Sequence, residues 1–314
     1  MKSIHYISIV LFFAVFSSCQ KVIDMDISSK PPKLVINAWL QPDSLVKVHL
    51  SHSIHILDDE EIKIVENGSI ILFENNSRVD SLIYIGNGMY SNTSFKPKSG
   101  NTYKIEASAP NYPAISAEAF IPDTVSIENI KIENNNDDYL NKSLSFSFKD
   151  PGNTNNYYLI YLETETEYPT DTIKYEYNPS SKYLVNFSID NPIVELSGYG
   201  LLDEYYPVDQ SGMSFENEKK IYANTIAFSD QAINGQSVQL KLNSNFYNYY
   251  EDSSISQKTN LHVVSISKDF FLYIGTITSS NDDPFTERIH VRTNVTNGYG
   301  ILLSSNKSSR SIHL

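Results

Sequence analysis

Cys19 is the only cysteine in 314 residues, and it stands at the end of the most apolar stretch of the chain. Lys2 belongs to a weakly basic start, residues 7–16 are almost entirely apolar, and two serines precede the thiol. This order of basic, apolar and small residues is typical of an export signal, and about ten apolar residues are too few to cross a bilayer, which takes ~20. We therefore predict a signal peptide at residues 1–18. The alternative is a buried N-terminal strand or helix with a core cysteine.

The segment that ends at Cys19, F-S-S-C, resembles a bacterial lipobox, in which the cysteine becomes the first residue and carries lipid such as palmitate on its sulfur and its amine. Several acyl chains anchor a protein stably, whereas one holds it only marginally. Gln20-Lys21, followed by Asp24 and Asp26, partly resembles the tag that sends lipoproteins of Bacteroidota to the outer face of the outer membrane. We expect a lipidated tether at residues 19–32 and a lipid-anchored outer-membrane protein that faces the cell exterior.

His49, His52 and His55 invite a zinc hypothesis because they recur every three residues. On a straight strand His52 points to the face opposite the other two, which lie about 20 Å apart at ~3.3 Å per residue. Three ligands on one zinc ion would need the strand to fold back. We therefore predict a solvated strand face and no metal site.

Acidic clusters occur at residues 58–61, 134–138 and 281–283. Oxygen-rich loops of this kind can hold calcium. None of them has the alternating D-x-D-x-D layout with a turn glycine. We favour solvated loops, with calcium binding as the alternative.

Enzyme templates are absent from the sequence. There is no G-x-S-x-G, no H-E-x-x-H and no glycine-rich loop that would cradle a phosphate. Cys19 is consumed by lipid, so a cysteine nucleophile is excluded, whereas a pair of carboxylates for glycoside cleavage stays open. We predict a protein that is not an enzyme and that has no cofactor.

Four tripeptides fit the pattern Asp-(Ser/Thr)-apolar, which resembles the acceptor motif for O-glycosylation of exported proteins in Bacteroidota. Their hydroxyl groups belong to Ser44, Ser81, Thr124 and Thr172. Each lies at a predicted turn or linker, where a glycan can be borne on the surface. The alternative is that Asp-Ser simply marks turns, and the sequence does not decide between the two.

The composition describes an acidic β protein. The net charge is −13 and the isoelectric point is near 4.9, so no basic patch is available to neutralise nucleic-acid phosphates. The 22 tyrosines favour strands, and the abundant asparagine and serine favour the turns between them. Without a second cysteine the exported chain has no disulfide, so it depends on its apolar core.

Residues 33–125 have the pattern of about seven or eight short strands with frequent turns, which is typical of an immunoglobulin-like sandwich. Residues 46–56 alternate apolar and polar side chains, as a half-buried strand does. Asn75-Asn76 and Asn87-Gly88 are hairpin turn signals. We predict an immunoglobulin-like β-sandwich over this range.

Residues 126–314 are predicted to form a second β-sandwich, immunoglobulin-like or fibronectin-like. The turn Asp150-Pro151-Gly152 separates two apolar strands and predicts a hairpin. Residues 164–220 are less regular and rich in tyrosine, proline and acids, so we expect an irregular insertion there. One helix is predicted at residues 265–277, where apolar residues recur at helical spacing and Ser267 is a plausible N-cap.

Several segments together resemble the DUF4249 lipoproteins of Bacteroidota. They are the start C-Q-K-V-I-D-M-D, the strand K-L-V-I-N-A-W-L, the turn F-K-D-P-G-N and the tail D-P-F-T-E-R-I-H-V-R-T-N-V-T-N-G-Y-G-I. The tail is the most specific part, with Pro284-Phe285, Asn294 and Gly298-Tyr299-Gly300 at their usual places. The family has no established activity, so the resemblance implies the location and the architecture of the protein. Members of the family often look like surface partners of TonB-dependent outer-membrane receptors, so the resemblance also suggests such a partner by association.

We therefore expect a non-catalytic surface lipoprotein that acts as an accessory subunit of a β-barrel. The resemblance implies that this barrel is a TonB-dependent receptor. Its expected partners are the outer membrane, through lipid on Cys19, and the barrel, which it serves in ligand capture or bracing; nucleic acid is not a partner. The insertion at residues 164–220 is the expected contact. The alternatives are a free-standing glycan- or peptide-binding module and a cell-surface scaffold or adhesin. The sequence leaves the ligand and the oligomeric state open.

Overall fold

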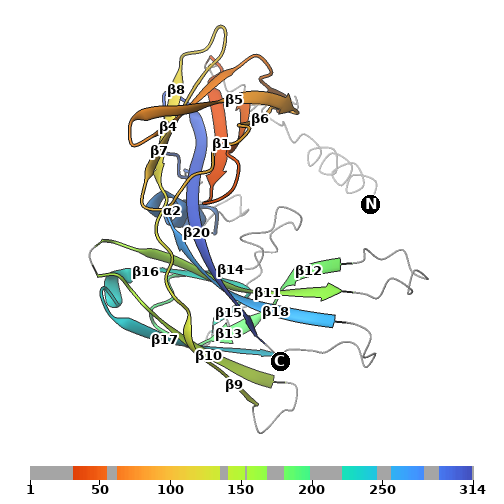
Figure 1. Ribbon diagram of the computed structural model, residues 1–314, viewed down its shortest axis with the longest axis vertical. Helices are drawn as coiled ribbons and strands as arrows, with labels where there is room; N and C mark the ends of the chain where they lie inside the picture. Colours follow the sequence, from red (N-terminus) through yellow and green to blue (C-terminus); the bar gives the residue numbers. More distant parts are fainter. Residues whose placement is uncertain are drawn as a thin grey trace, which may run out of the picture. The chain divides into compact units, whose positions relative to one another are not determined.

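Strands dominate the computed structural model (Figure 1). The chain divides into two units, Met1–Pro31 and Pro32–Leu314, and every described residue except Pro31 belongs to the second unit. The predicted signal peptide and nearly all of the predicted tether lie outside the described residues. The described residues are 31–54, 62–134, 141–152, 154–167, 180–198, 221–245, 256–278 and 290–312.

The strands are numbered in chain order. The first eight are β1 (Leu34–Leu40), β2 (Lys47–His52), β3 (Lys63–Ile64), β4 (Ser69–Glu74), β5 (Ser77–Gly86), β6 (Met89–Ser91), β7 (Thr102–Ser108) and β8 (Ile115–Phe120). The next eight are β9 (Glu128–Asn134), β10 (Asn141–Lys149), β11 (Tyr157–Glu167), β12 (Ser180–Leu184), β13 (Phe187–Ile189), β14 (Leu196–Gly198), β15 (Ile221–Ala223) and β16 (Thr225–Ser229). A short 3-10 helix η2 (Asp230–Ala232), β17 (Ser237–Asn245), β18 (Ser256–Ile266), helix α2 (Lys268–Thr278), β19 (Val295–Thr296) and β20 (Tyr299–Ile312) complete the order.

The first hydrophobic core is wrapped by a sheet that folds over on itself. Its strand order is β20-β1-β2-β6-β5-β4-β7-β8-β19. Strand β5 carries the fold-over, because its first half pairs with β4 and its second half with β6. Alternate residues point inward, so that Leu34 and Ile36 of β1 are fully buried while Trp39 is exposed. The predicted all-β sandwich architecture is confirmed, and the closer likeness to immunoglobulin domains stays a prediction.

Two predicted hairpin turns are confirmed. Asn75 and Asn76 connect β4 to β5 with φ angles of 47° and 67°, and Asn87 and Gly88 connect β5 to β6 with φ angles of 51° and 74°. Positive φ at both central residues gives the turn whose twist matches that of paired strands. Asparagine and glycine adopt this conformation more readily than other residues, so these turns could be predicted from the sequence.

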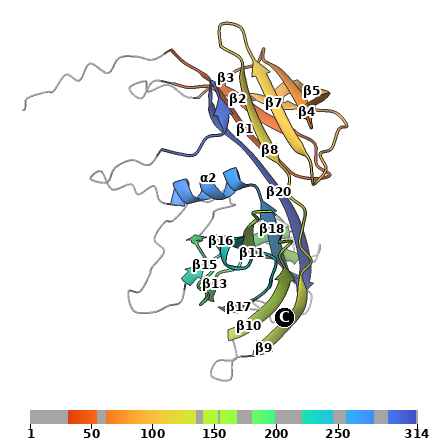
Figure 2. The ribbon, with the colours of Figure 1, turned by 90° about the vertical axis from the view of Figure 1, so that its left-hand side faces the viewer.

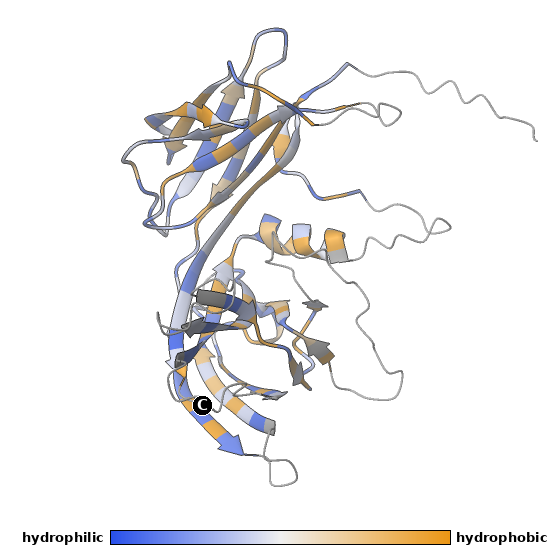
Figure 3. Ribbon diagram, turned by 90° about the vertical axis from the view of Figure 1, so that its right-hand side faces the viewer, coloured by the Kyte–Doolittle hydropathy of each residue, from blue (hydrophilic) through white to orange (hydrophobic). Residues whose placement is uncertain are grey.

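The second hydrophobic core lies between two sheets. One sheet has the order β15-β13-β17-β10-β9, and strands β14-β16-β11-β18-β20 form the facing part of the other. On β11, Tyr158, Ile160 and Leu162 point into this core, whereas Leu159 and Tyr161 point to the opposite side. The same alternation is visible as bands of hydrophobic and hydrophilic colour along the strands in Figure 3.

The hairpin predicted at Asp150-Pro151-Gly152 is wrong. Strand β10 pairs with β9 and β17, whereas β11 pairs with β12, β16 and β18, so the turn crosses from one sheet to the other. The buried Asp150 carboxylate holds this crossing, because it accepts hydrogen bonds from the Tyr158 hydroxyl at 2.5 Å and from the Gly235 N–H at 2.8 Å. Burial, with Asp150 beside the hydroxyl, raises the pKa of Tyr158 far above its usual range.

The irregular insertion predicted at residues 164–220 is wrong for its described part. Strand β11 continues through Glu167, and residues 180–198 contribute β12, β13 and β14. Buried side chains of this stretch belong to the second core, namely Val185, Phe187 and Ile189. Residues 180–198 are therefore structural, and the expected partner contact receives no support there. Residues 168–179 and 199–220 lie outside the described residues.

One strand serves both cores. Strand β20 runs from the first core into the second (Figure 1). It pairs in parallel with β1 up to Ser304 and in antiparallel fashion with β18 from Ser305 to Ile312. Leu302 accordingly belongs to the first core and Ile312 to the second. The expected division into residues 33–125 and residues 126–314 therefore does not separate the two cores, because residues 295–304, near the end of the described chain, belong to the first core.

Helix α2 confirms the predicted helix but not its start at residue 265, because it begins at Lys268 and Ser265 and Ile266 still belong to β18. The predicted N-cap is confirmed as well, because the Ser267 hydroxyl oxygen accepts the N–H of Phe270 at 3.3 Å. Phe270, Phe271 and Ile274 pack on the face of the β11–β18 sheet that points away from the second core. Figure 2 shows the helix lying along that sheet.

Candidate functional site

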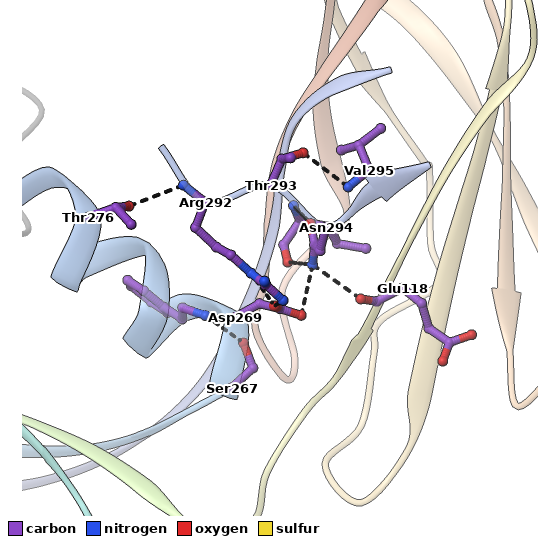
Figure 4. Close-up of polar contacts among 10 residues, drawn as sticks. Glu118, Ser267, Asp269, Thr276, Arg292, Thr293, Asn294 and Val295 are labelled. Atoms are coloured by element: carbon purple, nitrogen blue, oxygen red, sulfur yellow. Dashed lines mark hydrogen bonds and ion pairs between the residues drawn. The ribbon is translucent and has the colours of Figure 1, made fainter. Parts of the chain in front are cut away.

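Three polar side chains join helix α2 to the segment that enters β19, and we call Asp269, Arg292 and Asn294 the junction (Figure 4). The Arg292 guanidinium donates two hydrogen bonds to Oδ1 of Asp269, at 3.0 Å from Nε and 2.6 Å from Nη2. Asn294 Nδ2 donates to the other carboxylate oxygen at 3.3 Å. Asp269 lies in the first turn of α2, where the helix dipole also favours a negative charge.

Asn294 connects this ion pair to the first core. Its Oδ1 accepts the backbone N–H of Leu302 at 2.9 Å, and its Nδ2 donates to the carbonyl of Leu302 at 2.9 Å and to that of Glu118 at 3.3 Å. The backbone N–H of Arg292 donates to Thr276 Oγ1 at 3.2 Å. The segment is therefore bonded to the helix on one side and to β8 and β20 on the other, as Figure 4 shows.

Trp39 makes a second link between the first core and α2. Its indole Nε1 donates to Ser305 Oγ at 2.8 Å, and its ring meets the Phe270 ring edge-on with centroids 5.3 Å apart. Ser304 Oγ donates to the carbonyl of Phe120 at 2.6 Å. Strand β20 is thus held by β1, β8 and their neighbours at the place where it leaves the first core.

The junction is suited to holding elements together. The Asp269 carboxylate is paired with the Arg292 guanidinium through two hydrogen bonds to one of its oxygens, and the Arg292 side chain is 43% exposed. The arrangement therefore fixes α2 to the first core.

The predicted histidine face lies partly on β2. His49 is half-buried, and His52 stacks on Tyr112 with ring centroids 5.6 Å apart. His55 and the acidic residues 58–61 lie outside the described residues. Within the ranges that the structure describes, no three His, Cys, Asp or Glu side chains are grouped so that they could hold a metal ion.

Three of the four predicted glycan acceptors are described, and all three are exposed. Ser44 lies in the turn after β1, and Thr124 lies in the link after β8. Ser81 lies instead within β5, where its N–H donates to the Asp80 carboxylate at 2.8 Å, so the turn expected there is wrong. Thr172 and the predicted lipid acceptor Cys19 lie outside the described residues.

A buried histidine on β18 was not singled out from the sequence, and only the alternation along that strand could have indicated its burial. His262 is 3% exposed, its ring stacks on Tyr161 with centroids 4.5 Å apart, and its Nδ1 lies 2.8 Å from Ser309 Oγ. In the described part of the chain its Nε2 has no hydrogen-bond partner. Burial, helped by the charges of Lys307 and Lys182, lowers the pKa of His262 to about 4.

We expect His262 to destabilise the fold at acid pH. The unfolded chain takes up the imidazole proton below about pH 6.5, whereas the folded chain does so only near pH 4, so stability that is present at neutral pH is lost as the pH falls through this window. At pH 4.5 the loss amounts to about 2 kcal/mol. In urea unfolding, His262→Asn should lose less stability between pH 7 and pH 4.5 than the unchanged chain. His49→Asn, the control, should lose as much as the unchanged chain; equal losses in all three would contradict the expectation.

The fold and the junction define the class of protein: an all-β protein with two cores that share a strand and a polar junction that fixes its helix. The chain belongs to the family described as Domain of unknown function (DUF4249), which matches residues 20–311. No curated protein matches the chain. Eight chains of known structure match, among them a Corynebacterium diphtheriae protein described as membrane anchored, with 12% identity and a TM-score of 0.20. That match covers 76% of this chain and 55% of the other, so this chain spans about half of that protein.

The tail that carries the family resemblance builds the junction. Asn294 bonds to both polar backbone groups of Leu302, and a Cβ added to Gly298 would lie 2.7 Å from the carbonyl oxygen of Leu34. Gly300 passes still closer to β1. Pro284-Phe285 lies outside the described residues. No helix in the described ranges has both the length and the apolar character that a membrane crossing needs.

Proposed function

We propose that the protein is a non-catalytic surface lipoprotein of a Bacteroidota outer membrane, anchored by lipid on Cys19, and that it serves as an accessory subunit of a β-barrel. The proposed barrel is a TonB-dependent receptor, whose ligand the protein captures or whose outer face it braces. Membership of the DUF4249 family supports this, because the matched region begins at residue 20, directly after Cys19. The net charge of −13 suits a displayed, soluble surface and does not suit nucleic-acid binding.

The observation that carries the bracing role is that β20 belongs to the sheets of both cores. Domains joined by a linker move relative to each other by default. Here the connection is a continuous strand, paired along its length first with β1 and then with β18, and the junction adds hydrogen bonds from α2 to the first core. A protein built in this way can hold a partner in a set position, which is what an accessory subunit must do.

The proposed surface location also gives the exposed hydroxyl groups a role. Ser44, Ser81 and Thr124 are open to solvent and each follows an aspartate, so they are the described candidates for glycan attachment. A glycan on Thr124 would sit on the link between the strands of the two cores. We propose these three residues, with Thr172, as acceptor sites.

The anchor can be tested by replacing the proposed lipid acceptor. Cys19→Ser should move the protein from the membrane fraction to the soluble fraction, and protease added to intact cells should degrade the unchanged protein. Ser18→Ala is the matched control, because it keeps a small residue before the cysteine and should leave the protein in the membrane. A Cys19→Ser chain that stays membrane-bound, or an unchanged chain that is protected on intact cells, would count against the proposal.

A further inference from the structure

One outer face of the first core departs from the usual pattern of a sandwich. An antiparallel sheet with one face on a core normally carries polar side chains on the other. The register instead aligns Tyr299, Val35, Ser51 and Ile64 in one row across β20, β1, β2 and β3, and the residues that pair directly share a face. Tyr299 is 45% exposed and Ile64 is 39% exposed. This row is therefore apolar except for Ser51, which is only 3% exposed.

The next rows of the same face are mixed. Asn37 of β1 is exposed and pairs with the half-buried His49 of β2, and Lys47 of β2 shares a row with Ser91 of β6 and Ile83 of β5. Ile83 of β5 lies beside Ser91 of β6 and is 56% exposed. Ile85, at the bulge two residues further on, is 55% exposed. The two strands meet β3 at the β5–β6 turn, because the side chain of Ile64 lies close to Gly88. We call Tyr299, Val35, Ile64, Ile83 and Ile85 the apolar face.

The other outer face of the same core shows that this is not a general property of the sheet. There the exposed or half-buried residues of β7 and β8 include Lys104, Glu106, Ser116 and Glu118, and Lys104 forms an ion pair with Glu106 at 2.7 Å. That face is the more polar of the two, although Phe120 at the end of β8 is 49% exposed on it. On the first face two isoleucines are more than half exposed, and an occupant that covers them would remove this apolar area from water.

The charges around the apolar face limit what the occupant can be. The chain as a whole has a net charge of −13, and the register places no carboxylate of the described residues on this face; the acidic residues 58–61, between β2 and β3, lie outside the described residues. Its charged side chains are lysines: Lys47 lies at one end of β2, and the Lys33 ammonium lies over the Tyr299 ring at 5.4 Å from its centroid. Isoleucine and tyrosine with lysine at the edge is the composition of surfaces that lie in a lipid interface, where the lysine amines reach the headgroups.

The position of the proposed tether points to the same occupant. Lys33 leads directly into β1, and its backbone is fixed by two hydrogen bonds with Ser53, from Lys33 N–H to Ser53 Oγ at 3.0 Å and from Ser53 N–H to the Lys33 carbonyl at 2.8 Å. Strand β1 is one of the strands of the apolar face. Residues 19–32, even fully extended, reach at most about 50 Å. A lipid on Cys19 therefore keeps this face within that distance of the bilayer.

We propose that the apolar face lies on the membrane surface and acts as a second anchor beside the lipid. This inference rests on the proposed lipid anchor, which brings the face to the bilayer. The acyl chains expected on the sulfur and the amine of Cys19 anchor the protein stably by themselves, so the apolar face with its lysines adds a further, weaker contact with the membrane. The face would also set how the protein stands on the membrane, with β1, β3 and β5 against the headgroups.

A photoreactive side chain placed on the face tests this directly. The full, lipid-bearing protein carries benzoyl-phenylalanine at Ile64 or Ile83, and is reconstituted into vesicles of phosphatidylethanolamine and phosphatidylglycerol. We expect lipid adducts at both positions, and at least about ten-fold fewer from the same group at Glu118, which is exposed on the other outer face. In native membranes, adducts of Ile83 with protein and not with lipid would overturn the proposal in favour of a protein partner. Irradiation that yields no adduct at Ile64 and Ile83 would overturn it as well.

A second measurement separates this inference from the proposed anchor. Two full-length chains are compared by flotation with the same vesicles. One carries Cys19→Ser, and the other carries Cys19→Ser together with Ile83→Ser and Ile85→Ser. We expect residual vesicle binding that falls about ten-fold with the two serines, since each isoleucine removes apolar area from water. Mass spectrometry of the N-terminal peptide from the unchanged protein reports the lipid independently. An N-terminal peptide without lipid would contradict the proposed lipid anchor. Equal vesicle binding by the Cys19→Ser chain with and without Ile83→Ser and Ile85→Ser would contradict the proposed contact between the apolar face and the membrane.

Discussion

Replacing Gly300 with alanine is expected to destabilise the protein by about 4 kcal/mol, the largest effect of any single methyl group that we expect here. Gly300 has a φ of 98°, a conformation that side chains other than glycine rarely adopt, and an added Cβ would collide with the carbonyl oxygen of Ile36 on β1. The parallel β1–β20 pair cannot move apart without opening the first core, because Ile36 and Leu302 are both fully buried in it. Urea or thermal unfolding of the Gly300→Ala chain measures the loss.

Gly86→Ala is the matched control for this clash. Gly86 has a similar φ of 108°, but nothing lies within 4 Å of the Cβ that would be added. Its substitution should therefore show the backbone strain alone, about 1–2 kcal/mol. A Gly300→Ala chain that loses no more stability than Gly86→Ala would contradict the close approach of β20 to β1.

Replacing Asn294 with alanine is expected to cost about 3 kcal/mol. The change removes the acceptor for the Leu302 N–H and the donor for the carbonyls of Leu302 and Glu118, and it leaves polar backbone groups of a buried residue without these partners. It also removes the bond to Asp269, so α2 loses part of its connection to the first core. We expect α2 to become more mobile, which amide hydrogen exchange along residues 268–278 measures together with the unfolding midpoint.

Asn306→Ala, on β20, is the control for the loss of an asparagine that donates to a backbone carbonyl. Its Nδ2 donates one hydrogen bond, to the carbonyl of Pro122 at 3.0 Å, so we expect a loss of about 1 kcal/mol. Asp269→Asn should cost less than Asn294→Ala, because the ion pair with Arg292 is partly exposed and screened by water. If Asn294→Ala is no more destabilising than Asn306→Ala, the junction does not hold the segment as described.

Features that depend on neighbouring residues could be predicted from the sequence. The turns at Asn75-Asn76 and Asn87-Gly88 follow from residues that accept positive φ, and α2 follows from apolar spacing and a serine N-cap. The all-β class follows from the same local patterns. These predictions needed no knowledge of which strand lies beside which.

Features that depend on pairing across the chain could not be predicted. The parallel pairing of β1 with β20 joins opposite ends of the described chain, and neither strand carries a local signal for it. The hairpin at Asp150 failed for a related reason, because the buried carboxylate bonds to Gly235 far along the chain. The polar composition of residues 164–220 concealed strands whose inward side chains are apolar.

The candidate site was predictable only in part. The tail resemblance singled out Asn294 and Gly300, and the structure places both where β20 meets β1 and α2. It did not indicate Asp269, whose carboxylate meets Arg292 from a helix that is distant in sequence. The apolar face was missed because Ile64 and Ile83 look like ordinary strand residues until the register shows which side they face.

The most direct test of the proposed function is to isolate the protein with its partner. The chain, carrying a tag after Leu314, is purified from native membranes in mild detergent, and the proteins that accompany it are identified and quantified by mass spectrometry. We predict a large β-barrel receptor in a one-to-one ratio, retained in the Ser18→Ala control. Recovery of the chain alone, from membranes in which Cys19 carries lipid, would contradict the accessory-subunit function and would favour a free-standing binding module.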